Sequence, residues 1–346
     1  MMNCINVSII IPVYSVSDYI EACISSVMRQ TYPHIECIIV DDSSPDDSIE
    51  KCQRLITNYS GDISFVILHH DHNRGLSAAR NTGTDAATGD YVFYLDSDDE
   101  IAPYCIEKLV EPLMNDSTIE LVQGNYKRMG NRVVYGNHSE VSDTDMANNV
   151  CAFSHPYDMN SNKEIRAYYY EKNRMGYSVW NKLIRKSFIS NNHIRFKEGL
   201  LWEDGLWLFY VMKYLGHVFF VPDYTYIYKI RSSSIVASAR ETEKLGYLAS
   251  VYEDIFSHFT PNDKERESFF YLRRFCRHYL VSNGDPRFQS AYDLLWKAFS
   301  DGKHYKVLIH LYFVHLISKY TFTRWLFKQC LKVYRVCRNL YWKLKK

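Results

Sequence analysis

The sequence lacks the short motifs by which several enzyme classes bind phosphate or metal. No Gly-x-Gly-x-x-Gly follows the first apolar run, and there is neither a P-loop nor a His-Glu-x-x-His pair. The nine cysteines include no Cys-x-x-Cys pair, which argues against a zinc ribbon and a disulfide framework and suits a reducing cytosol. Because the usual phosphate-binding devices are missing, any phosphate bound by this chain needs a metal ion to neutralise it.

Acidic residues are missing from the C-terminal end. The stretch after Asp301 holds 11 of the 41 Lys and Arg and none of the 40 Asp and Glu, so residues 1–301 carry a net charge of −10. An acidic body repels nucleic acid, and no nucleic-acid recognition motif is present. We therefore expect no nucleic-acid partner.

Long apolar runs are also absent. The longest, at about 307–317, contains two histidines and is too short to span a bilayer. The first, at 9–11, is too short for the core of a secretory signal and ends at Pro12. These features favour a cytoplasmic protein, either free or peripheral at the inner face of the cytoplasmic membrane.

The basic tail indicates how contact with a membrane would arise. Its apolar residues recur at steps of four and three, with basic residues opposite and Trp325 and Trp342 flanking the apolar face. A basic amphipathic helix with tryptophans suits an anionic membrane surface, where each basic group contributes about 1 kcal/mol. A core-packed or dimerising helix is the alternative. The apolar residues are Leu326, Cys330, Val333, Cys337, Leu340 and Leu344.

Apolar runs alternate with helical patterns along the first hundred residues, which is typical of a parallel sheet with helices on both faces. The expected strands are 7–13, 37–40, 65–68, 91–95, 119–124, 218–221 and 224–228. Helices are expected at 20–28, 49–56, 76–87, 163–171 and 203–214, and from 241 onward. Ser44 and Pro45 have the residue types of an N-cap and of a first helical position, which would start the second helix there.

Carboxylates follow two of these strands. Asp41 and Asp42 end the second strand, and Asp96 and Asp98 follow the fourth. Because parallel sheets bind ligands beyond the carboxyl ends of their strands, we expect both pairs to face one crevice. Aspartates spaced like Asp96 and Asp98 can share one hard cation, which can then hold a diphosphate. A polar turn that caps the next helix is the alternative.

Other side chains near these strand ends suit a nucleotide. Tyr14 follows the first strand and offers an aromatic face for a base, and Asp42 could accept from the imide N–H of a pyrimidine. Arg74 and Arg80 lie near the third strand-to-helix junction, where an arginine could offset diphosphate charge. Taken singly, each has an ordinary alternative: a core-edge tyrosine, a turn aspartate or a surface arginine.

Eight short stretches, in order along the chain, closely resemble family 2 glycosyltransferases. They cover roughly residues 5–235, and the whole ordered set is specific although each piece alone is weak. Their positions are 7–14, 26–32, 40–46, 73–81, 96–99, 180–183, 203–204 and 228–231. The resemblance implies a GT-A fold with a mostly parallel, Rossmann-like sheet, a nucleotide-diphosphate sugar as donor, Mn²⁺ or Mg²⁺ as cofactor, and inversion at the anomeric centre.

The resemblance also implies roles for individual residues. Asp96 and Asp98 match the DxD metal motif, which Asp99 extends, and Asp204 matches the general base, with Glu203 as the competing carboxylate. Asp204 opens a helical pattern, so we expect the helix dipole to keep it ionised. The set expected to bind the nucleotide sugar is Pro12, Tyr14, Asp42, Arg74, Arg80, Asp96, Ser97, Trp180, Lys182 and Glu203.

Two positions depart from the family pattern. Ser15 stands where the family usually has Asn, and Lys229 and Ile230 change the usual spacing before Arg231. We expect a GT-A catalytic domain over 1–235 and a helical C-terminal region over 236–346.

The expected function is transfer of a sugar, with a UDP-sugar favoured, to a hydroxyl of a glycan or lipid-linked acceptor. The pathway would be bacterial cell-surface polysaccharide synthesis. Two alternatives stay open: a sugar nucleotidyltransferase, and a non-catalytic assembly subunit that binds sugar nucleotides. The first is disfavoured because the chain lacks an N-terminal glycine-rich phosphate loop, and the second because Asp96, Asp98 and Asp204 are intact.

Overall fold

The structure is a computed structural model, which describes residues 4–129, 154–172, 178–230, 241–258, 271, 274–279, 282, 285–301, 311 and 315. The chain divides into two compact units, Met1–Ala239 and Arg240–Lys346. This division falls four residues after the predicted end of the catalytic domain at 235.

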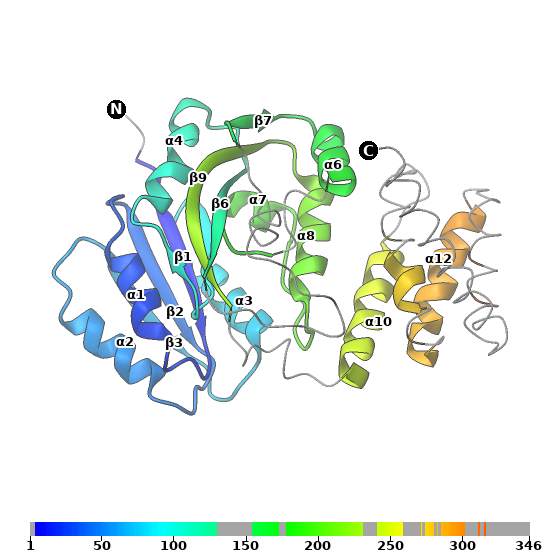
Figure 1. Ribbon diagram of the computed structural model, residues 1–346, viewed down its shortest axis with the longest axis horizontal. Coiled ribbons are helices and arrows are strands. Elements are labelled where there is room, and N and C mark those ends of the chain that lie inside the picture. The colour runs from blue at the N-terminus through cyan, green and yellow to red at the C-terminus, as the bar shows by residue number, and fades with distance from the viewer. Residues whose placement is uncertain are drawn as a thin grey trace, which may run out of the picture. The chain divides into compact units, whose positions relative to one another are not determined.

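Four parallel strands open the first unit, in the spatial order β3-β2-β1-β4; Figure 1 labels the first three of them, β1, β2 and β3. They alternate with helices as the hydrophobic pattern predicts. The strands are β1 (Val7–Val13), β2 (Ile35–Asp41), β3 (Ser64–His69) and β4 (Tyr91–Tyr94). The helices between them are α1 (Ile20–Met28), α2 (Ser48–Thr57) and α3 (Leu76–Ala86).

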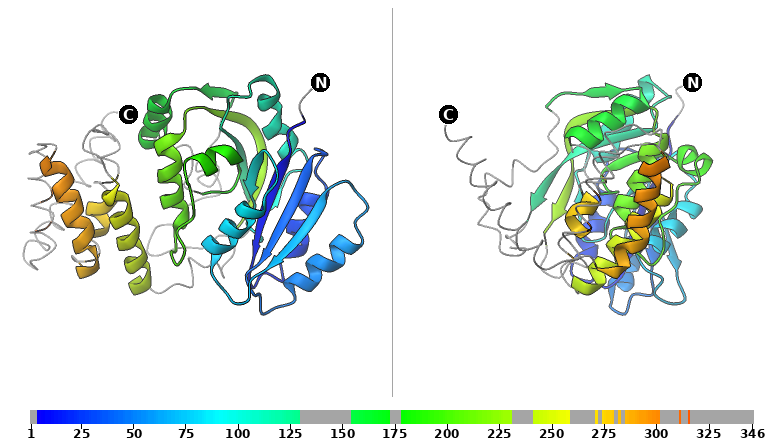
Figure 2. Two further views of the ribbon diagram at one scale, coloured as in Figure 1. Left: turned by 180° about the vertical axis from the view of Figure 1, so that it is seen from behind. Right: turned by 90° about the vertical axis from the view of Figure 1, so that its right-hand side faces the viewer.

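Strand β1 is buried along its whole length because helices cover both faces of the sheet. Ile9 and Ile11 pack in one core with apolar residues of α1 and α2. The side chain of Ile10 points to the other face, where it lies against Gly83 of α3. Alternate residues of one strand therefore face helices on opposite sides of the sheet, and the ribbons in Figure 2 show helices on both sides of it.

The sheet continues beyond β4 in the order β4-β8-β6-β9-β5, with β7 paired to β9. Strand β8 is antiparallel to both β4 and β6, whereas β6 and β9 are parallel to each other. The added strands are β5 (Glu100–Ile101), β6 (Leu121–Met129), β7 (Tyr157–Met159), β8 (Lys182–Arg185) and β9 (Val218–Lys229). The accompanying helices are α4 (Cys105–Asn115), α6 (Asn162–Lys172), α7 (Lys186–Asn191) and α8 (Glu203–Tyr214).

Two sequence predictions about element boundaries are wrong. The stretches 218–221 and 224–228 form one strand, β9, whose pairing with β6 shifts register between Gln123 and Tyr126; this irregularity lets the strand continue past Pro222. Helix α2 begins at Ser48 rather than after Ser44, because a carboxylate oxygen of Asp46 accepts from the Ser48 N–H at 3.2 Å.

The described part of the second unit is helical. It contains α10 (Glu241–Ser257), a 3₁₀ turn, η1 (Pro286–Phe288), and α12 (Gln289–Asp301). Its core is aromatic, with Phe275 packed against Tyr252 and Phe288. The predicted amphipathic tail lies outside the described residues, as does Arg231. Within the part that the structure describes, every helix is too short or too polar to cross a bilayer.

Candidate active site

The turn after β4 places three carboxylates beside β9. Asp96 and Asp98 are partly exposed, whereas Ser97 and Asp99 are buried. Asp99 Oδ2 accepts from the hydroxyl of Tyr226 at 2.7 Å, and its Oδ1 accepts from the Lys229 N–H at 2.7 Å. Burial, together with the charges of Asp98 and Asp96, raises the pKa of Asp99 to about 9. Asp99 therefore ties the turn to β9, whereas Asp96 and Asp98 are the more exposed carboxylates of the turn.

Arg80 gathers carboxylates from two distant parts of the chain. Its Nη2 lies 2.8 Å from Asp96 Oδ1, and its Nη1 lies 2.6 Å from Glu203 Oε1 and 3.0 Å from Asp204 Oδ1. The residue is 1% exposed, and α3 carries it beneath the strand ends. Its partners are carboxylates of the protein rather than the predicted diphosphate, so Arg80 acts as a brace within the protein. The guanidinium joins the predicted metal motif to the predicted base.

Asp204 lies in the first turn of α8, as predicted. The helix dipole does not keep its pKa low, however. Burial raises the pKa of Asp204 to about 7, with Arg80 opposing the rise and Glu203 adding to it. The side chain of Asp204 is 26% exposed, against 7% for Glu203. Asp204 is therefore the better placed of the two to receive a proton from a bound hydroxyl near neutral pH.

Asp42 is buried behind the strand ends. Its Oδ1 accepts from the Arg74 N–H at 2.8 Å and lies 2.6 Å from His70 Nδ1, and its Oδ2 accepts from the Gly75 N–H at 2.7 Å. With 3% of its surface exposed, Asp42 anchors the turn that enters α3, where Gly75 has a positive φ of 89°. Contact of Asp42 with a nucleobase stays a prediction.

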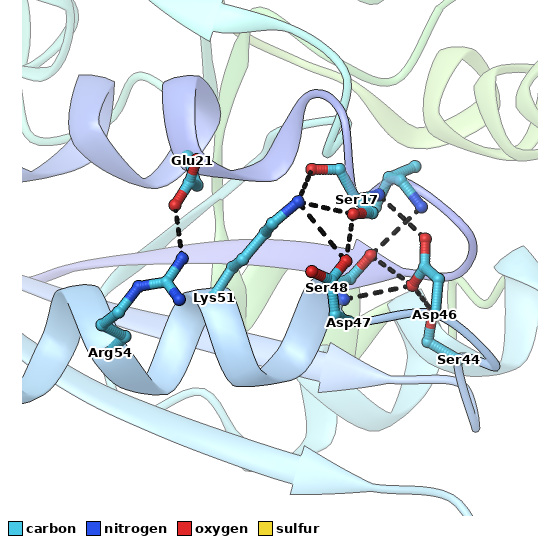
Figure 3. Close-up of polar contacts among 9 residues, drawn as sticks. Ser17, Glu21, Ser44, Asp46, Asp47, Ser48, Lys51 and Arg54 are labelled. Atoms are coloured by element: carbon cyan, nitrogen blue, oxygen red, sulfur yellow. Dashed lines mark hydrogen bonds and ion pairs between the residues drawn. The ribbon is translucent and has the colours of Figure 1, made fainter.

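The loop carrying Tyr14 is fastened to the start of α2 by the polar network in Figure 3. Asp46 accepts from the Ser17 N–H at 2.9 Å and from the hydroxyls of Ser44 and Ser48 at 2.8 and 2.5 Å. Lys51 Nζ donates to the carbonyl of Ser17 at 2.9 Å. These bonds come from residues that are close only because β1 and β2 pair.

The fastened loop presents an exposed ring. Tyr14 is 46% exposed, and the next residue, Ser15, is held at a φ of 51°, where its N–H donates to Ser44 Oγ at 2.9 Å. Pro12 lies within β1 opposite Val40. Tyr14 therefore has the exposure that stacking on a base needs, and the hydrogen bonds of Asp46 and Ser44 fix its loop.

Trp180 and Lys182 flank a residue that sequence analysis missed. Asn181 has a φ of 59°, and its side chain donates to the carbonyl of Gly124 at 2.7 Å and accepts from the Thr225 hydroxyl at 2.6 Å. Lys182 is buried and donates to the carbonyl of Ser178 at 2.6 Å. In the sequence, Asn181 lies between two residues that were predicted to bind the nucleotide sugar, Trp180 and Lys182. Its positive φ cannot be read from the sequence.

The donor atoms at the end of β4 suit a hard divalent ion. Among the described residues, no group of three or more His, Cys, Asp or Glu is arranged to hold a metal. Mg²⁺ and similar ions, however, are commonly held by one or two carboxylates together with substrate phosphates. Asp96 and Asp98 supply that number of carboxylates, and their charges add to burial in raising the pKa of Asp99.

Comparison with known sequences agrees with this geometry. The profile described as Glycosyl transferase family 2 matches residues 8–191, which is more than half of the chain. The chain belongs to glycosyltransferase family 2. An uncharacterized glycosyltransferase YibD of Escherichia coli (strain K12) is 29% identical over 70% of this chain and 67% of its own. Putative glycosyltransferase EpsH of Bacillus subtilis (strain 168) is 32% identical over 66% of this chain.

The match to EpsH spans 62% of that relative's length, less than two thirds of it. Solved glycosyltransferase structures share the fold of this family 2 chain. Staphylococcus aureus TarS 1–349 in complex with UDP-GlcNAc aligns with a TM-score of 0.65 at 19% identity, over 90% of this chain and 91% of TarS 1–349. The mannosyltransferase PcManGT from Pyrobaculum calidifontis, in complex with GDP-Man and Mn²⁺, aligns with a TM-score of 0.55 at 16% identity over 98% and 88%. The predicted GT-A fold is confirmed.

Proposed function

We propose that this chain is an inverting, metal-assisted glycosyltransferase that moves a hexosyl group from a nucleotide-diphosphate sugar to a hydroxyl of a glycan or lipid-linked saccharide. The observation that carries the proposal is the Arg80 brace. One buried guanidinium holds Asp96, which follows β4, and Asp204, which begins α8. The carboxylate that we propose binds the cation and a carboxylate whose pKa is raised to about 7 thus pair with one guanidinium.

The donor would lie across the ends of β1 and β4. Tyr14 would stack on the base, and Arg74, whose side chain is 40% exposed and lies 3.6 Å from Glu198, would face the donor beside the entry to α3. Asp96 and Asp98 would hold Mn²⁺ or Mg²⁺, which when bound neutralises the diphosphate and its departing charge. A UDP-sugar is favoured, since TarS is solved with UDP-GlcNAc, although the GDP-Man complex of PcManGT shows that the fold also accepts guanosine donors.

The proposed reaction is a single displacement. Asp204 takes the proton of the acceptor hydroxyl while that oxygen forms a bond to the anomeric carbon. The bond from that carbon to the diphosphate oxygen breaks, and its electron pair leaves with the nucleoside diphosphate. Attack from the face opposite the leaving group inverts the anomeric centre and needs one base and no covalent intermediate.

The setting we infer is cell-surface polysaccharide synthesis in a bacterium. A relative from Bacillus subtilis (strain 168), 38% identical over 32% of this chain, is named a putative teichuronic acid biosynthesis glycosyltransferase. We place the protein in the cytoplasm, with the basic tail contacting anionic lipid where a lipid-linked acceptor resides. Flotation with anionic vesicles, before and after removal of 320–346, tests this placement, and unchanged flotation after truncation would reject it.

The activity is tested by release of nucleoside diphosphate from UDP-GlcNAc and GDP-mannose in the presence of Mn²⁺. Asp98→Ala should abolish donor binding and turnover, and Asp204→Asn should lower turnover about 10²- to 10⁴-fold while the donor still binds. Asp62→Ala, which removes an exposed aspartate of the α2–β3 loop, is the matched control. Turnover unchanged in both site variants would overturn the assignment, and donor binding without turnover in the wild type would favour a non-catalytic subunit.

A further inference from the structure

A set of aromatic rings lies on one face of β6 and β9, beside the site already described. We call Tyr126, Trp180, Tyr226 and Tyr228 the aromatic platform. Trp180 stacks on Tyr226, with ring centroids 4.5 Å apart and planes 12° apart, and on Tyr228 at 5.5 Å and 16°. Tyr126 meets Trp180 edge-on at 4.9 Å. Tyr226 is fully buried, whereas the other three rings are partly exposed.

The aromatic platform is held in a fixed position between the metal-binding turn and the proposed base. At one end the hydroxyl of Tyr226 donates to Asp99 and lies 3.4 Å from the Asp96 N–H. At the other end Val179, which precedes Trp180, directs its N–H to Asp204 Oδ2 at 3.4 Å. A ring that rests on Trp180 would therefore lie next to the carboxylate that must deprotonate an acceptor.

The order of the strands separates this surface from the nucleotide side. Strand β4, which leads into Asp96 and Asp98, has β1, β2 and β3 on one side and β8, β6 and β9 on the other. Tyr14 and Asp42 belong to the first side, and the aromatic platform to the second. A donor that spans Tyr14 and the end of β4 leaves the aromatic platform for the other substrate.

The guanidinium of Arg128 lies at the edge of the aromatic platform. Arg128 follows Tyr126 by two residues on β6 and pairs with Tyr228 in the β6–β9 register. Its guanidinium lies over the Tyr126 ring and donates to the Tyr126 hydroxyl at 3.3 Å. Its buried Nε has no hydrogen-bond partner, and no carboxylate among the described residues forms an ion pair with it. A guanidinium in this state is suited to a carboxylate or phosphate.

We propose that the aromatic platform and Arg128 form the acceptor subsite, and that the acceptor is a pyranoside that carries a negative charge next to the ring that stacks. The apolar C–H face of a pyranose can rest on the exposed rings, which are amphipathic and already fixed. Arg128 would then pair with a carboxylate or a phosphate of the acceptor. This inference rests on the proposed function, and it moves Trp180 from the donor set to the acceptor set.

Ligand-observed saturation-transfer NMR tests the subsite with defined probes, in the presence of UDP and Mg²⁺. The probes are methyl β-D-glucopyranoside, methyl β-D-glucuronide, α-D-glucose 1-phosphate and inorganic phosphate. We expect the glucuronide or the sugar phosphate to bind about tenfold more tightly than the neutral glycoside. Tighter binding of the glucuronide identifies a uronate, and tighter binding of glucose 1-phosphate identifies a phosphate. Failure of every pyranoside to bind, or binding of inorganic phosphate as tight as that of the sugar phosphate, would overturn the proposal.

Variants assign the signal to these residues. Arg128→Gln should remove the preference for charge and leave the neutral glycoside unaffected, whereas Trp180→Phe and Tyr228→Leu should weaken all three pyranosides. Lys127→Gln changes the neighbouring exposed cation on the opposite face of β6, and Tyr157→Leu changes an exposed tyrosine of β7; both should bind like the wild type.

The affinity for UDP, measured by calorimetry, should be unchanged in every variant. If Arg128→Gln or Trp180→Phe weakens UDP as much as the pyranosides, or if Lys127→Gln acts like Arg128→Gln, the acceptor subsite is rejected. Release of nucleoside diphosphate by the wild type is scored separately, so the proposed function can stand if the subsite fails.

Discussion

At the scale of single residues, one arginine, Arg80, pairs with three carboxylates. Its one positive charge meets Asp96, Glu203 and Asp204 within 3.0 Å, so full ionisation of all three would leave a net charge of −2. Burial raises the pKa of Asp204, and the neighbouring charge of Glu203 adds to that rise. The same guanidinium pairs with Asp96, a proposed ligand of the cation, and with Asp204, the proposed base.

Turnover should depend on the protonation of Asp204. A base works only when deprotonated, and the pKa of Asp204 is raised to about 7 in the ligand-free protein, so kcat/KM should rise with pH through about 7 and level off above it. An ordinary aspartate would give a rate independent of pH over that range, since its pKa lies near 4. A pH profile of kcat/KM measures this. A profile flat from pH 5.5 to 8.5 would contradict the assignment of Asp204.

Removal of the brace should destabilise the protein. Arg80→Gln leaves buried carboxylates unpaired, which costs about 3–5 kcal/mol of unfolding free energy, measured by urea denaturation at pH 7.5. The matched control is Arg195→Gln, since Arg195 pairs with Asp85 on the surface and its loss should cost at most about 1 kcal/mol. Equal losses in the two variants would show that Arg80 is no brace.

At the scale of elements, the site is assembled where loops from neighbouring strands are fastened together. The polar network around Asp46 ties the end of β1 to the start of α2, and Asp99 ties the end of β4 to β9. Neither tie involves the reacting atoms. Each fixes the loop that presents a candidate binding group, Tyr14 in the first case and Asp96 in the second.

Loss of the Asp46 network should weaken nucleotide binding through Tyr14. Asp46→Ala removes the acceptor of the Ser17 N–H and of two serine hydroxyls, so the Ser15 conformation is no longer enforced. We expect UDP affinity to fall about tenfold, and by no more in the double variant with Tyr14→Ala than in Tyr14→Ala alone. Glu50 is an exposed acid in the first turn of α2, and Glu50→Ala should leave the affinity for UDP unchanged. Additive losses in the double variant would separate Asp46 from Tyr14.

The strand ends were predictable because their pattern is local. Consecutive apolar residues indicate a buried strand, and in a parallel sheet ligands bind beyond the carboxyl ends of the strands. These two rules identified Asp42 and Asp96 as residues at the ligand-binding edge. The contacts of Arg80 were not predictable, because Glu203 and Asp204 lie 123 and 124 residues away in sequence. The continuity of β9 was missed because Pro222 resembles a strand end, whereas a change of register accommodates it.

At the scale of the whole first unit, the sheet order places the two proposed subsites on different sides of one strand. Strand β4 lies between the β1–β3 strands and the β8–β6–β9 strands, and Asp96 and Asp98 follow it. Sequence alone located the β1–β3 side and its alternating helices. It did not locate β8 or β5, since β8 is antiparallel and each is four residues or fewer, too short for a periodic pattern.

The central claim is that a divalent ion between Asp96, Asp98 and a diphosphate holds the donor. Isothermal titration of UDP and GDP into the full chain tests it without knowledge of the sugar, with Mn²⁺ and again with excess EDTA. We predict binding of at least one nucleotide with Mn²⁺, and loss of that binding in EDTA and in the Asp96→Asn/Asp98→Asn double variant. Equal affinity with Mn²⁺ and with EDTA, or undiminished binding by the double variant, would contradict the account.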